Sequence, residues 1–478
     1  MPSTAVPWLV LLNREQAATR QQKVCAMLRA AIRSGQLAGG ARLPSSRLLA
    51  VDLALSRITV EAAYARLESE GYLLRQAGRG TFVAEHLAAR PTQAARSTTP
   101  VLSRRGQQIV AGGGCDDPPF PQAFAAGSPE LRAFPLRLWQ RLTRQRLRLD
   151  GESLLGYGDP QGLPALREAI AAYLGQSRGV RCHAGQVMVL TSSQQALQMI
   201  ALLLCDPGDR VWLETPGYAG AWQAFNSAGA AIQGITLDGE GAQIPIDAPP
   251  PKLVYLTPSH QYPTGVTLGL QRRLAWLSYA RRQGCWLIED DYDSEFHYDG
   301  RPMPALQGLE PDARTLYVGT FSKVLFPSLR LAYLVVPEGL IDALRRLRST
   351  LDGHSAQLMQ AVTADFMQQG HFAAHLRLMR QLYASRHDLL LQALAERLPT
   401  QLTPLPHQGG LQLTVLLNGG GEQRLTCEAA DAGLLLPRLS PLYRQHAPQQ
   451  GWILGYSALQ PGEIVQAVDK LARLRYHI

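Results

Sequence analysis

Lys323 is the first residue whose chemistry stands out, because it is one of only four lysines in a chain of 478 residues that contains 43 arginines. It lies in the segment GTFSKVLFPSLRLAY, directly after two hydroxyl residues, Thr320 and Ser322, and seven residues before Arg330. A lysine removed from water loses its proton readily and becomes a nucleophile, whereas arginine does not. The alternative is a buried or snorkelling lysine without a chemical role, and the rest of the chain must decide between the two.

Hydroxyl groups, an arginine and a predicted helix start offer ligands for a phosphate. Lys323 can form a Schiff base with an aldehyde cofactor, while guanidinium and hydroxyl groups hold the phosphate of that cofactor. The segment TSSQQALQM runs from a predicted strand into a predicted helix, where free backbone amides favour an anion. The candidate phosphate ligands are Ser193, Gln194, Thr320, Ser322 and Arg330.

A predicted strand, CWLIEDD, ends in two aspartates and is followed by a tyrosine. Ligands of parallel sheets bind at the carboxyl ends of the strands. Asp290 or Asp291 could pair there with a protonated pyridine nitrogen, and the Tyr292 hydroxyl could hydrogen-bond a phenolic oxygen. Tyr218, in TPGYAG, is suited to stack on a flat ring. Together with the lysine, these residues predict a pocket for pyridoxal 5'-phosphate (PLP).

Such a pocket needs a sheet whose strands end at one edge. From about residue 116 onward, short apolar segments alternate with segments of helical periodicity, which predicts a mostly parallel α/β sheet covered on both faces. The predicted strands are 187–191, 210–214, 252–258, 285–291 and 315–320, and the predicted helices are 163–175, 195–204, 270–283 and 338–349. Residues 116–478 are therefore expected to form one large domain.

The excess positive charge of the chain lies in its first quarter. The net charge is +9, and residues 1–110 contain 15 Lys and Arg against 6 Asp and Glu, whereas residues 111–478 contain 32 of each class. A basic, solvated tail is one explanation for this distribution. A surface that binds nucleic acid is the other.

The pattern of residues 14–84 favours a folded domain over a tail. Apolar residues recur at helical spacing in 16–34, and Ser45 and Ser56 can cap two further helices joined by a short link. This arrangement is typical of a helix-turn-helix. The segments YLL and GTFVA flank a glycine-containing turn and predict a two-stranded wing. Residues 85–115, rich in Ala, Pro, Thr, Arg and Gly, are expected to form a linker.

The second helix of a helix-turn-helix enters the major groove of DNA, and its first turn meets the bases. That turn contains Arg57, which can contact guanine or phosphate, and Thr59, which can contact a thymine methyl group or a phosphate oxygen. Further phosphate contacts are expected at the start of the preceding helix and at the tip of the wing. The candidate DNA-binding residues are Arg42, Ser45, Arg47, Arg57, Thr59, Arg79, Gly80 and Thr81.

Composition excludes several classes of protein. We find no apolar run of twenty residues, and the short apolar run near the N-terminus lacks the basic start of a secretion signal. The six cysteines are scattered, without a CxxC pair or a spacing typical of zinc ligands. The sequence thus predicts a cytoplasmic protein with reduced, buried thiols, without a metal site and without a membrane partner.

The segments LPSSRLLA, LSRITVEAAYARLESEGYLL and GRGTFV make residues 14–84 similar to the winged helix-turn-helix of the GntR superfamily of bacterial transcription regulators. The large domain resembles a fold-type I aminotransferase in the order of YGDPQGLPALREAIAAYL, TSSQQAL, PGY, TPSHQYPTG, IEDDYDSEF and TFSKVLFPSLRLAY. The combination resembles the MocR subfamily of GntR regulators over nearly the whole chain. This resemblance implies a homodimer with operator DNA, PLP, and an amino compound or PLP itself as effector.

The same resemblance implies a role for each candidate in the large domain. Lys323 would hold PLP covalently as an internal aldimine, and Asp290, in preference to Asp291, would meet the pyridine nitrogen. Tyr292 would meet the phenolic oxygen and Tyr218 would stack on the ring. The phosphate would fall to Ser193, Gln194, Thr320, Ser322 and Arg330.

The sequence also departs from enzymatic aminotransferases. Tyr262 stands where those enzymes carry the asparagine of Asn-Pro-Thr-Gly, and Leu454 stands where they carry an arginine for the α-carboxylate of the substrate. Arg438 is the nearest alternative to that arginine. Gly220 stands where aminobutyrate-sensing relatives carry a ligand-binding arginine.

These departures favour a PLP-binding regulator, in which ligand binding reorients two DNA-binding heads, over a working aminotransferase with a DNA-binding head. A winged-helix regulator whose large domain binds no cofactor is a third hypothesis, and it requires the placement of Lys323 and Asp290 to be a coincidence.

Overall fold

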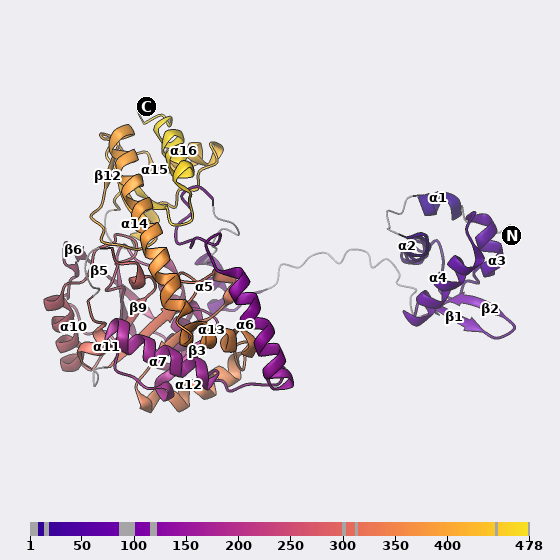
Figure 1. Ribbon diagram of the computed structural model, residues 1–478, viewed down its shortest axis with the longest axis horizontal. Coiled ribbons are helices and arrows are strands. Elements are labelled where there is room, and N and C mark those ends of the chain that lie inside the picture. Colours follow the sequence, from indigo (N-terminus) through magenta and orange to yellow (C-terminus); the bar gives the residue numbers. More distant parts are fainter. Residues whose placement is uncertain are drawn as a thin grey trace. The chain divides into compact units, whose positions relative to one another are not determined.

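The computed structural model describes residues 8–13, 19–85, 101–114, 122–298, 303–310, 314–444 and 448–476. The chain divides into two compact units, Met1–Val101 and Leu102–Ile478, each with its own hydrophobic core (Figure 1). We call them the amino-terminal unit and the large unit.

The amino-terminal unit contains four helices and a hairpin in its described part. They are α1 (Trp8–Asn13), α2 (Arg20–Arg33), α3 (Ser46–Asp52), α4 (Arg57–Ser69), β1 (Leu73–Gln76) and β2 (Gly80–Val83). The predicted helix over 16–34 begins later, at Arg20, after an N-cap by Thr19; residues 16–18 lie outside the described part. Val24, Leu28, Val60 and Leu67 are fully buried in its core, as expected from the periodicity.

Both predicted serine caps of the helix-turn-helix are present. The Ser45 hydroxyl accepts a hydrogen bond from the Leu48 amide, and the Ser56 hydroxyl accepts one from the Thr59 amide, each at 3.2 Å. These bonds satisfy amide groups that the first helical turn leaves free. Between the two helices Ala54 adopts a left-handed backbone conformation, with φ 51°, which makes the link tight. The antiparallel pair β1–β2 forms the predicted wing.

Part of the predicted linker is folded. Residues 104–111 form α5 (Arg104–Ala111), capped by Ser103, and this helix packs against α9 (Ala219–Ser227) of the large unit. The sequence analysis did not predict this helix. None of its described side chains is fully buried. Residues 86–100 and 115 of the predicted linker lie outside the described part.

The large unit is built on a seven-stranded sheet with the order β3-β11-β10-β9-β8-β4-β5. The strands are β3 (Val187–Leu190), β4 (Arg210–Glu214), β5 (Ala231–Ile235), β8 (Leu253–Leu256), β9 (Trp286–Asp291), β10 (Thr315–Thr320) and β11 (Ala332–Val335). All pairs are parallel except the two made by β11, which the sequence had not predicted. The predicted mostly parallel sheet is confirmed.

Helices cover both faces of this sheet, because alternate strand residues are buried on opposite sides. Met188 and Leu190 pack with α8 and α9 on one face, whereas Val187 and Val189 belong to the cluster on the other face. The helices are α6 (Leu136–Leu149), α7 (Pro164–Arg178), α8 (Ser193–Leu204), α10 (Leu270–Gln283), α11 (Leu306–Leu309), α12 (Glu338–Leu351), α13 (Gln357–Gln368) and α14 (His371–Arg397).

A smaller antiparallel sheet lies toward the C-terminus. It consists of β12 (Leu402–Pro404), β13 (Gln412–Leu417) and β14 (Gly451–Gly455), with α15 (Glu422–Asp431) and α16 (Pro461–Ala472). The two-residue strands β6 (Leu237–Asp238) and β7 (Gly241–Ala242) pair separately. Short 3-10 helices lie at Gly151–Leu154, Ala184–Gln186, Ser294–Phe296, Pro327–Leu329 and Ser440–Leu442.

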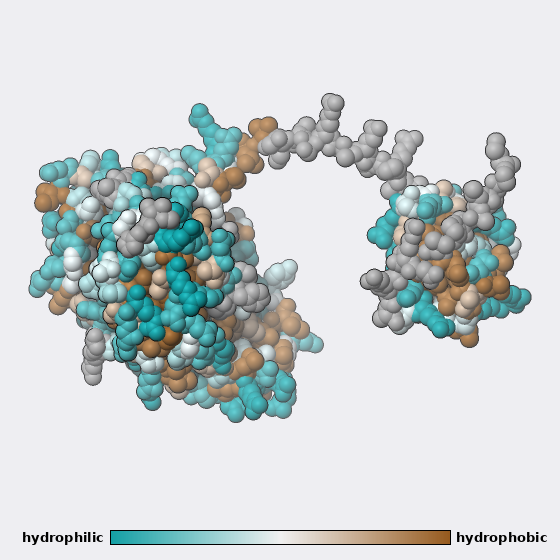
Figure 2. Space-filling model, turned by 90° about the horizontal axis from the view of Figure 1, so that it is seen from above, coloured by the Kyte–Doolittle hydropathy of each residue, from teal (hydrophilic) through white to brown (hydrophobic). Residues whose placement is uncertain are grey.

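Hydrophilic and hydrophobic patches alternate on the visible face of the large unit (Figure 2). No described helix is both long and apolar enough to cross a membrane. The described cysteines are free thiols, but the prediction that they are buried holds only for Cys25 and Cys285. Cys182 and Cys205 are half-buried and Cys427 is exposed, while Cys115 lies outside the described part.

Candidate functional site

A cavity of about 610 Å³ lies at the carboxyl ends of the parallel strands of the large unit. We call it the Lys323 cavity. Every residue proposed for the cofactor lines it, although these residues come from segments more than a hundred positions apart. Its walls are Ala126, Gly127, Ser192, Ser193, Gln194, Gln195, Gln198, Tyr218, Tyr255, Thr257, Tyr262, Asp290, Tyr292, Asp293, Thr320, Ser322, Lys323, Arg330, Leu411, Gln412, Leu435 and Pro437.

Lys323 lies in the turn that follows β10, close to the opposite wall. A Cβ atom at Gly127 would come within 2.8 Å of its Nζ, and Gly127 has a left-handed φ of 68°. Glycine is therefore required there both by the backbone and by the proximity of the lysine. Lys323 Nζ forms neither an ion pair nor a hydrogen bond with any described residue, so the amine is available to a ligand.

The two neighbouring aspartates of β9 have different environments. Asp291 accepts hydrogen bonds from Arg178 at 2.8 Å and Tyr317 at 2.6 Å, and it does not line the cavity. Burial opposes ionisation of Asp291, but these partners hold its pKa below the usual value. Asp290 does line the cavity, and only its Oδ2 is bonded, to the Tyr255 hydroxyl at 2.8 Å.

The second oxygen of Asp290, Oδ1, is buried without a hydrogen-bond partner in the described part of the chain. Burial raises the pKa of Asp290 to about 7, against the lowering effect of the Tyr255 hydrogen bond. A cationic donor placed at Oδ1 would satisfy this oxygen and favour the ionised carboxylate. A protonated pyridine nitrogen is such a donor, so the residues present fit PLP.

The phosphate candidates gather at the start of α8 and in the turn after β10. Ser192 caps α8 by accepting a hydrogen bond from the Gln195 amide at 3.1 Å, which leaves Ser193 and Gln194 in the first helical turn. The Ser322 amide donates to Thr320 Oγ1 at 3.1 Å, which fixes the turn before Lys323. Arg330 is exposed, has a left-handed φ of 53° and lies on the hairpin between β10 and β11.

Three tyrosines form an aromatic series along the cavity. The rings of Tyr218 and Tyr262 lie 5.7 Å apart, and those of Tyr262 and Tyr292 lie 6.2 Å apart, both edge to face. Tyr218 precedes α9, so this helix sets its position. The Tyr292 hydroxyl donates to the His260 carbonyl oxygen at 3.1 Å. It must leave or share that bond to donate to a ligand.

The positions at which relatives carry a ligand-binding arginine hold no cation in the cavity. A Cβ atom at Gly220 would lie 2.4 Å from Gln194 Oε1 and 2.5 Å from the Tyr218 ring, so a side chain does not fit. Leu454 is fully buried on β14. Arg438 is half-buried, pairs through its backbone with Trp452, and does not line the cavity.

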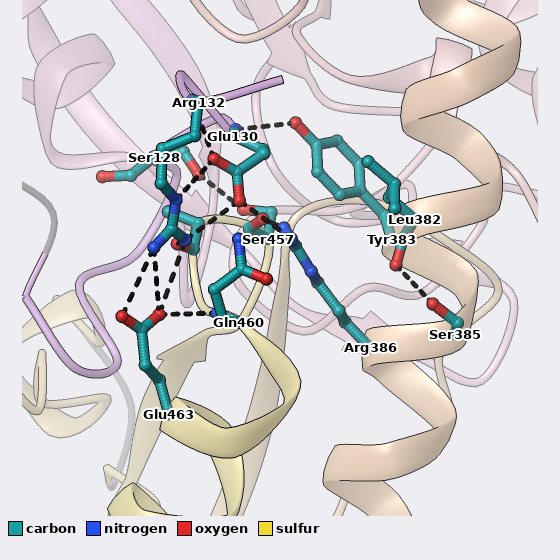
Figure 3. Close-up of polar contacts among 11 residues, drawn as sticks. Ser128, Glu130, Arg132, Leu382, Tyr383, Ser385, Arg386, Ser457, Gln460 and Glu463 are labelled. Carbon is teal, nitrogen blue, oxygen red and sulfur yellow. Dashed lines mark hydrogen bonds and ion pairs between the residues drawn. The ribbon is translucent and has the colours of Figure 1, made fainter.

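An ion-pair cluster beside the cavity holds the segment that carries Gly127 (Figure 3). Arg386 of α14 donates to buried Glu130 at 2.8 Å, and Arg132 donates to the same carboxylate at 2.9 Å. The Ser457 hydroxyl donates to the Ser128 carbonyl oxygen at 2.6 Å. Burial opposes ionisation of Glu130, but the arginines hold its pKa below the usual value. A neighbouring cavity of about 450 Å³ is lined by this cluster, whose charges are paired with one another.

Several cavity residues escaped the sequence analysis. Asp293, two residues after Asp291, lines the cavity and lies 2.8 Å from His260 Nδ1 through its Oδ1. The acidic residues at the end of the strand indicated such a position, but the sequence analysis considered only Asp290 and Asp291 as carboxylate ligands. Gln412 comes from the antiparallel C-terminal sheet, which the sequence analysis did not identify.

In the amino-terminal unit, the DNA-binding candidates lie on the two capped helix starts and the wing. The wing tip approaches the loop before α3, since a Cβ atom at Gly80 would lie 3.0 Å from Arg42 Nε. Arg79 and Gly80 are exposed and Thr81 is half-buried. The half-buried Thr59 places its hydroxyl 2.7 Å from the Ser56 hydroxyl, so it takes part in the cap.

The arginines of this unit fall into two classes. Arg29, Arg66 and Arg75 form ion pairs with glutamates of the same unit. The four candidate arginines are exposed and none forms an ion pair with another described residue; they are Arg42, Arg47, Arg57 and Arg79. Ile58, which the sequence analysis missed, is 81% exposed beside Arg57 and can make an apolar base contact.

Comparisons with known proteins agree with this division. The model of bacterial regulatory proteins of the gntR family matches residues 20–83, and the model of aminotransferase class I and II matches residues 127–446.

Two curated relatives extend over almost the whole chain. A probable rhizopine catabolism regulatory protein, MocR, of Rhizobium meliloti is 38% identical over 97% of this chain and 95% of its own length. A pyridoxine biosynthesis transcriptional regulator, PdxR, of Corynebacterium glutamicum is 29% identical over 94% of each chain.

Among solved structures, the kynurenine aminotransferase of Pyrococcus horikoshii matches 79% of this chain and 95% of its own, with a TM-score of 0.69 and 26% identity. The α-aminoadipate aminotransferase LysN of Thermus thermophilus, complexed with N-(5'-phosphopyridoxyl)-L-leucine, matches 78% of this chain and 94% of its own, with the same TM-score and identity.

Proposed function

Because this chain belongs to the MocR subfamily of the GntR family of bacterial regulators, we propose that it is a transcription regulator that binds PLP in the Lys323 cavity and operator DNA through its amino-terminal unit. The effector is an amino compound or PLP itself. We further propose that the protein acts in the cytoplasm as a homodimer, whose two DNA-binding heads select half-sites about one helical turn or multiples of it apart.

PLP supplies, when bound, an aldehyde that primary amines can condense with. In this proposal Lys323 is the residue that holds the cofactor covalently, and Asp290 is the acceptor for its pyridine nitrogen. Tyr292 serves the phenolic oxygen and Tyr218 packs against the ring. The phosphate ligands are Ser193, Gln194, Thr320, Ser322 and Arg330.

The single observation that carries the cofactor proposal is the unsatisfied Asp290 Oδ1 in the cavity that also contains the unpaired Lys323 amine. A buried carboxylate oxygen without a partner is costly, and a cationic donor removes the cost. A coincidental pairing of these two groups in a cavity without a ligand has no such explanation.

The DNA proposal rests on the unpaired arginines of the amino-terminal unit. Arg57 is exposed and Thr59 is half-buried in the first turn of α4, and the other candidates lie near the start of α3 or on the wing; they are Arg42, Ser45, Arg47, Arg79, Gly80 and Thr81. Arginine–phosphate contacts release counterions, so operator binding is expected to fall steeply with salt.

A crossed pair of variants tests both halves of the proposal. Arg57→Ala should weaken operator binding and leave the absorption band of bound PLP unchanged. Lys323→Ala should remove that band, keep operator binding near the ligand-free level and abolish the effector response. The full chain is used, with absorbance and fluorescence anisotropy measured on the same samples. A PLP band that survives Lys323→Ala, or operator affinity unaffected by Arg57→Ala at physiological salt, would contradict the corresponding half.

A working aminotransferase is the second candidate function, because the cavity keeps the lysine, aspartate and tyrosine that serve PLP. One difference from such enzymes is Leu454, which is fully buried and stands where they carry an arginine for the carboxylate of the substrate. Sustained conversion of an amino donor and a keto acid by the purified protein would support the enzyme over the regulator.

A further inference from the structure

The two oxygens of Asp293 have different environments. This carboxylate is buried, with 1% of its surface exposed, and it lines the Lys323 cavity. Its Oδ1 lies 2.8 Å from His260 Nδ1, which is equally buried. Its Oδ2 accepts no hydrogen bond from any residue of the described chain. Asp293 thus offers one fixed oxygen and one open oxygen to the cavity.

One glycine lies against this oxygen and another against the lysine. A Cβ atom at Gly410 would lie 2.6 Å from Asp293 Oδ2, and φ at Gly410 is 89°. A Cβ atom at Gly127 would lie 2.8 Å from Lys323 Nζ and 3.9 Å from Gln412 Oε1. No side chain at Gly127 therefore covers the Lys323 amine, and the Asp293 carboxylate and the Gln412 amide line the same cavity.

The charges that line the cavity do not suit a carboxylate ligand. Among the described lining residues, the acidic ones are Asp290 and Asp293 and the cationic ones are Lys323 and Arg330. The proposed function assigns both cations to PLP. A ligand carboxylate next to Asp293 would face a like charge in a site of low dielectric constant, where repulsion is strong.

A hydroxyl or a second ammonium group has the opposite effect at the same place. It would donate to Asp293 Oδ2 and form a charge-assisted hydrogen bond. Burial raises the pKa of Asp293, against the lowering effects of His260 and, to a smaller extent, Lys323, so a donor from the ligand would also favour the ionised carboxylate.

We infer that the effector, on the premise of the proposed PLP-dependent function, is a primary amine that bears hydroxyl or further amino groups and no carboxylate beside the reacting amine. Its amine replaces Lys323 as the nitrogen bonded to the cofactor, and Lys323 leaves as a free amine, so the exchange needs no oxidant, reductant or water. Asp293 binds the neighbouring donor and thereby discriminates amines from amino acids.

Two matched pairs of probes test the inference on the full-length, PLP-loaded protein. Serinol differs from serine only by a hydroxymethyl group in place of the carboxylate. Cadaverine differs from lysine only by the absence of the carboxylate. The cofactor band and operator binding are measured as each probe is titrated. We expect half-saturation by serinol and cadaverine at concentrations at least about tenfold below those of serine and lysine.

The variant Asp293→Asn gives the more specific test. Asparagine has the shape of aspartate and can still accept a hydrogen bond from His260, but it carries no charge. We expect it to weaken serinol about tenfold and to improve serine, so that the preference narrows or inverts. The matched control is Asp342→Asn on α12, an exposed carboxylate that does not line the cavity, which should leave both titrations unchanged.

Equal or tighter binding of the amino acids to the unmodified protein overturns the inference, as does a preference that Asp293→Asn leaves intact. A PLP band that responds to none of the four probes also overturns it, while leaving PLP binding itself established. Absence of any PLP band before titration is a different failure, that of the proposed function.

Discussion

The arginines of the two units have contrasting environments. In the large unit, Arg178 and Arg386 are buried and paired with Asp291 and Glu130. In the amino-terminal unit, the described arginines are exposed or half-buried, and the four DNA-binding candidates Arg42, Arg47, Arg57 and Arg79 have no acidic partner among the described residues.

This contrast separates structural from ligand-directed arginines better than position in the sequence does. A buried guanidinium must be compensated by the protein itself, because desolvation of an unpaired charge is costly. An exposed, unpaired guanidinium is hydrated in the free protein and can exchange its water for a phosphate oxygen. Arg330 belongs to the second class although it lies in the large unit, which is consistent with a phosphate ligand.

The largest expected effect is on the buried pair. Arg386→Leu removes one partner of Glu130 and should lower the free energy of unfolding of the large unit by about 3–5 kcal/mol. Denaturant unfolding followed by near-UV circular dichroism measures it. The control, Arg66→Leu in the exposed pair with Glu70, should cost about 0–1 kcal/mol. Similar losses in the two variants would contradict the division into classes.

The second effect concerns the neighbouring aspartates. Asp290→Asn should weaken PLP binding by about 10- to 100-fold, because a hydrogen bond to a charged group is lost. Asp291→Asn should instead lower stability, since it leaves Arg178 buried without its counter-ion. PLP affinity from absorbance titration and unfolding midpoints distinguish the two. The reverse outcome would assign the pyridine nitrogen to Asp291.

The third effect is steric. Gly220→Ala places a methyl group against Gln194 and the Tyr218 ring, and overpacking of this kind costs about 1–3 kcal/mol. We expect weaker PLP binding and a shifted cofactor band. The matched variant is Gly239→Ala, where nothing lies within 4 Å, and it should behave like the unmodified protein. An unchanged absorption band of the cofactor in Gly220→Ala would show that Tyr218 does not determine the position of the PLP ring.

The smallest effect is expected at the DNA surface, one contact at a time. Arg57→Ala should reduce the slope of log affinity against log salt by about 1, together with a moderate loss of affinity. Arg66→Ala, on the same helix but paired with Glu70, should leave the slope unchanged. Anisotropy titrations with operator DNA at several salt concentrations measure both. Equal slopes for the two variants would contradict a contact between Arg57 and the phosphates of the operator DNA.

Local chemistry made most elements of the fold predictable. Ser45 and Ser56 cap helices because their hydroxyls accept from amides three residues later, an interaction that lies within one turn and needs no tertiary information. The buried parallel strands could be predicted because each is a short apolar run between helical segments. Family membership and the mostly parallel sheet are confirmed by the comparisons.

The direction of β11 and the environment of the residues that line the cavity could not be predicted from the sequence. The strand β11 is buried on both sides, so its apolar run carries no sign that it is antiparallel to β10. Likewise, the open oxygen of Asp293 follows from a partner, His260, which lies 33 residues away and reaches it only in the folded chain. The roles of the cavity residues remain predictions, whereas their convergence on one cavity is observed.

One helix ties the cavity to the end of the linker. The helix α9 follows directly after Tyr218, and its Gln223 side chain donates to the Gly112 carbonyl oxygen just after α5. A Cβ atom at Gly112 would overlap the end of the Gln223 side chain. The tyrosine that lines the cavity and the end of the linker are thus in contact with the same nine-residue helix.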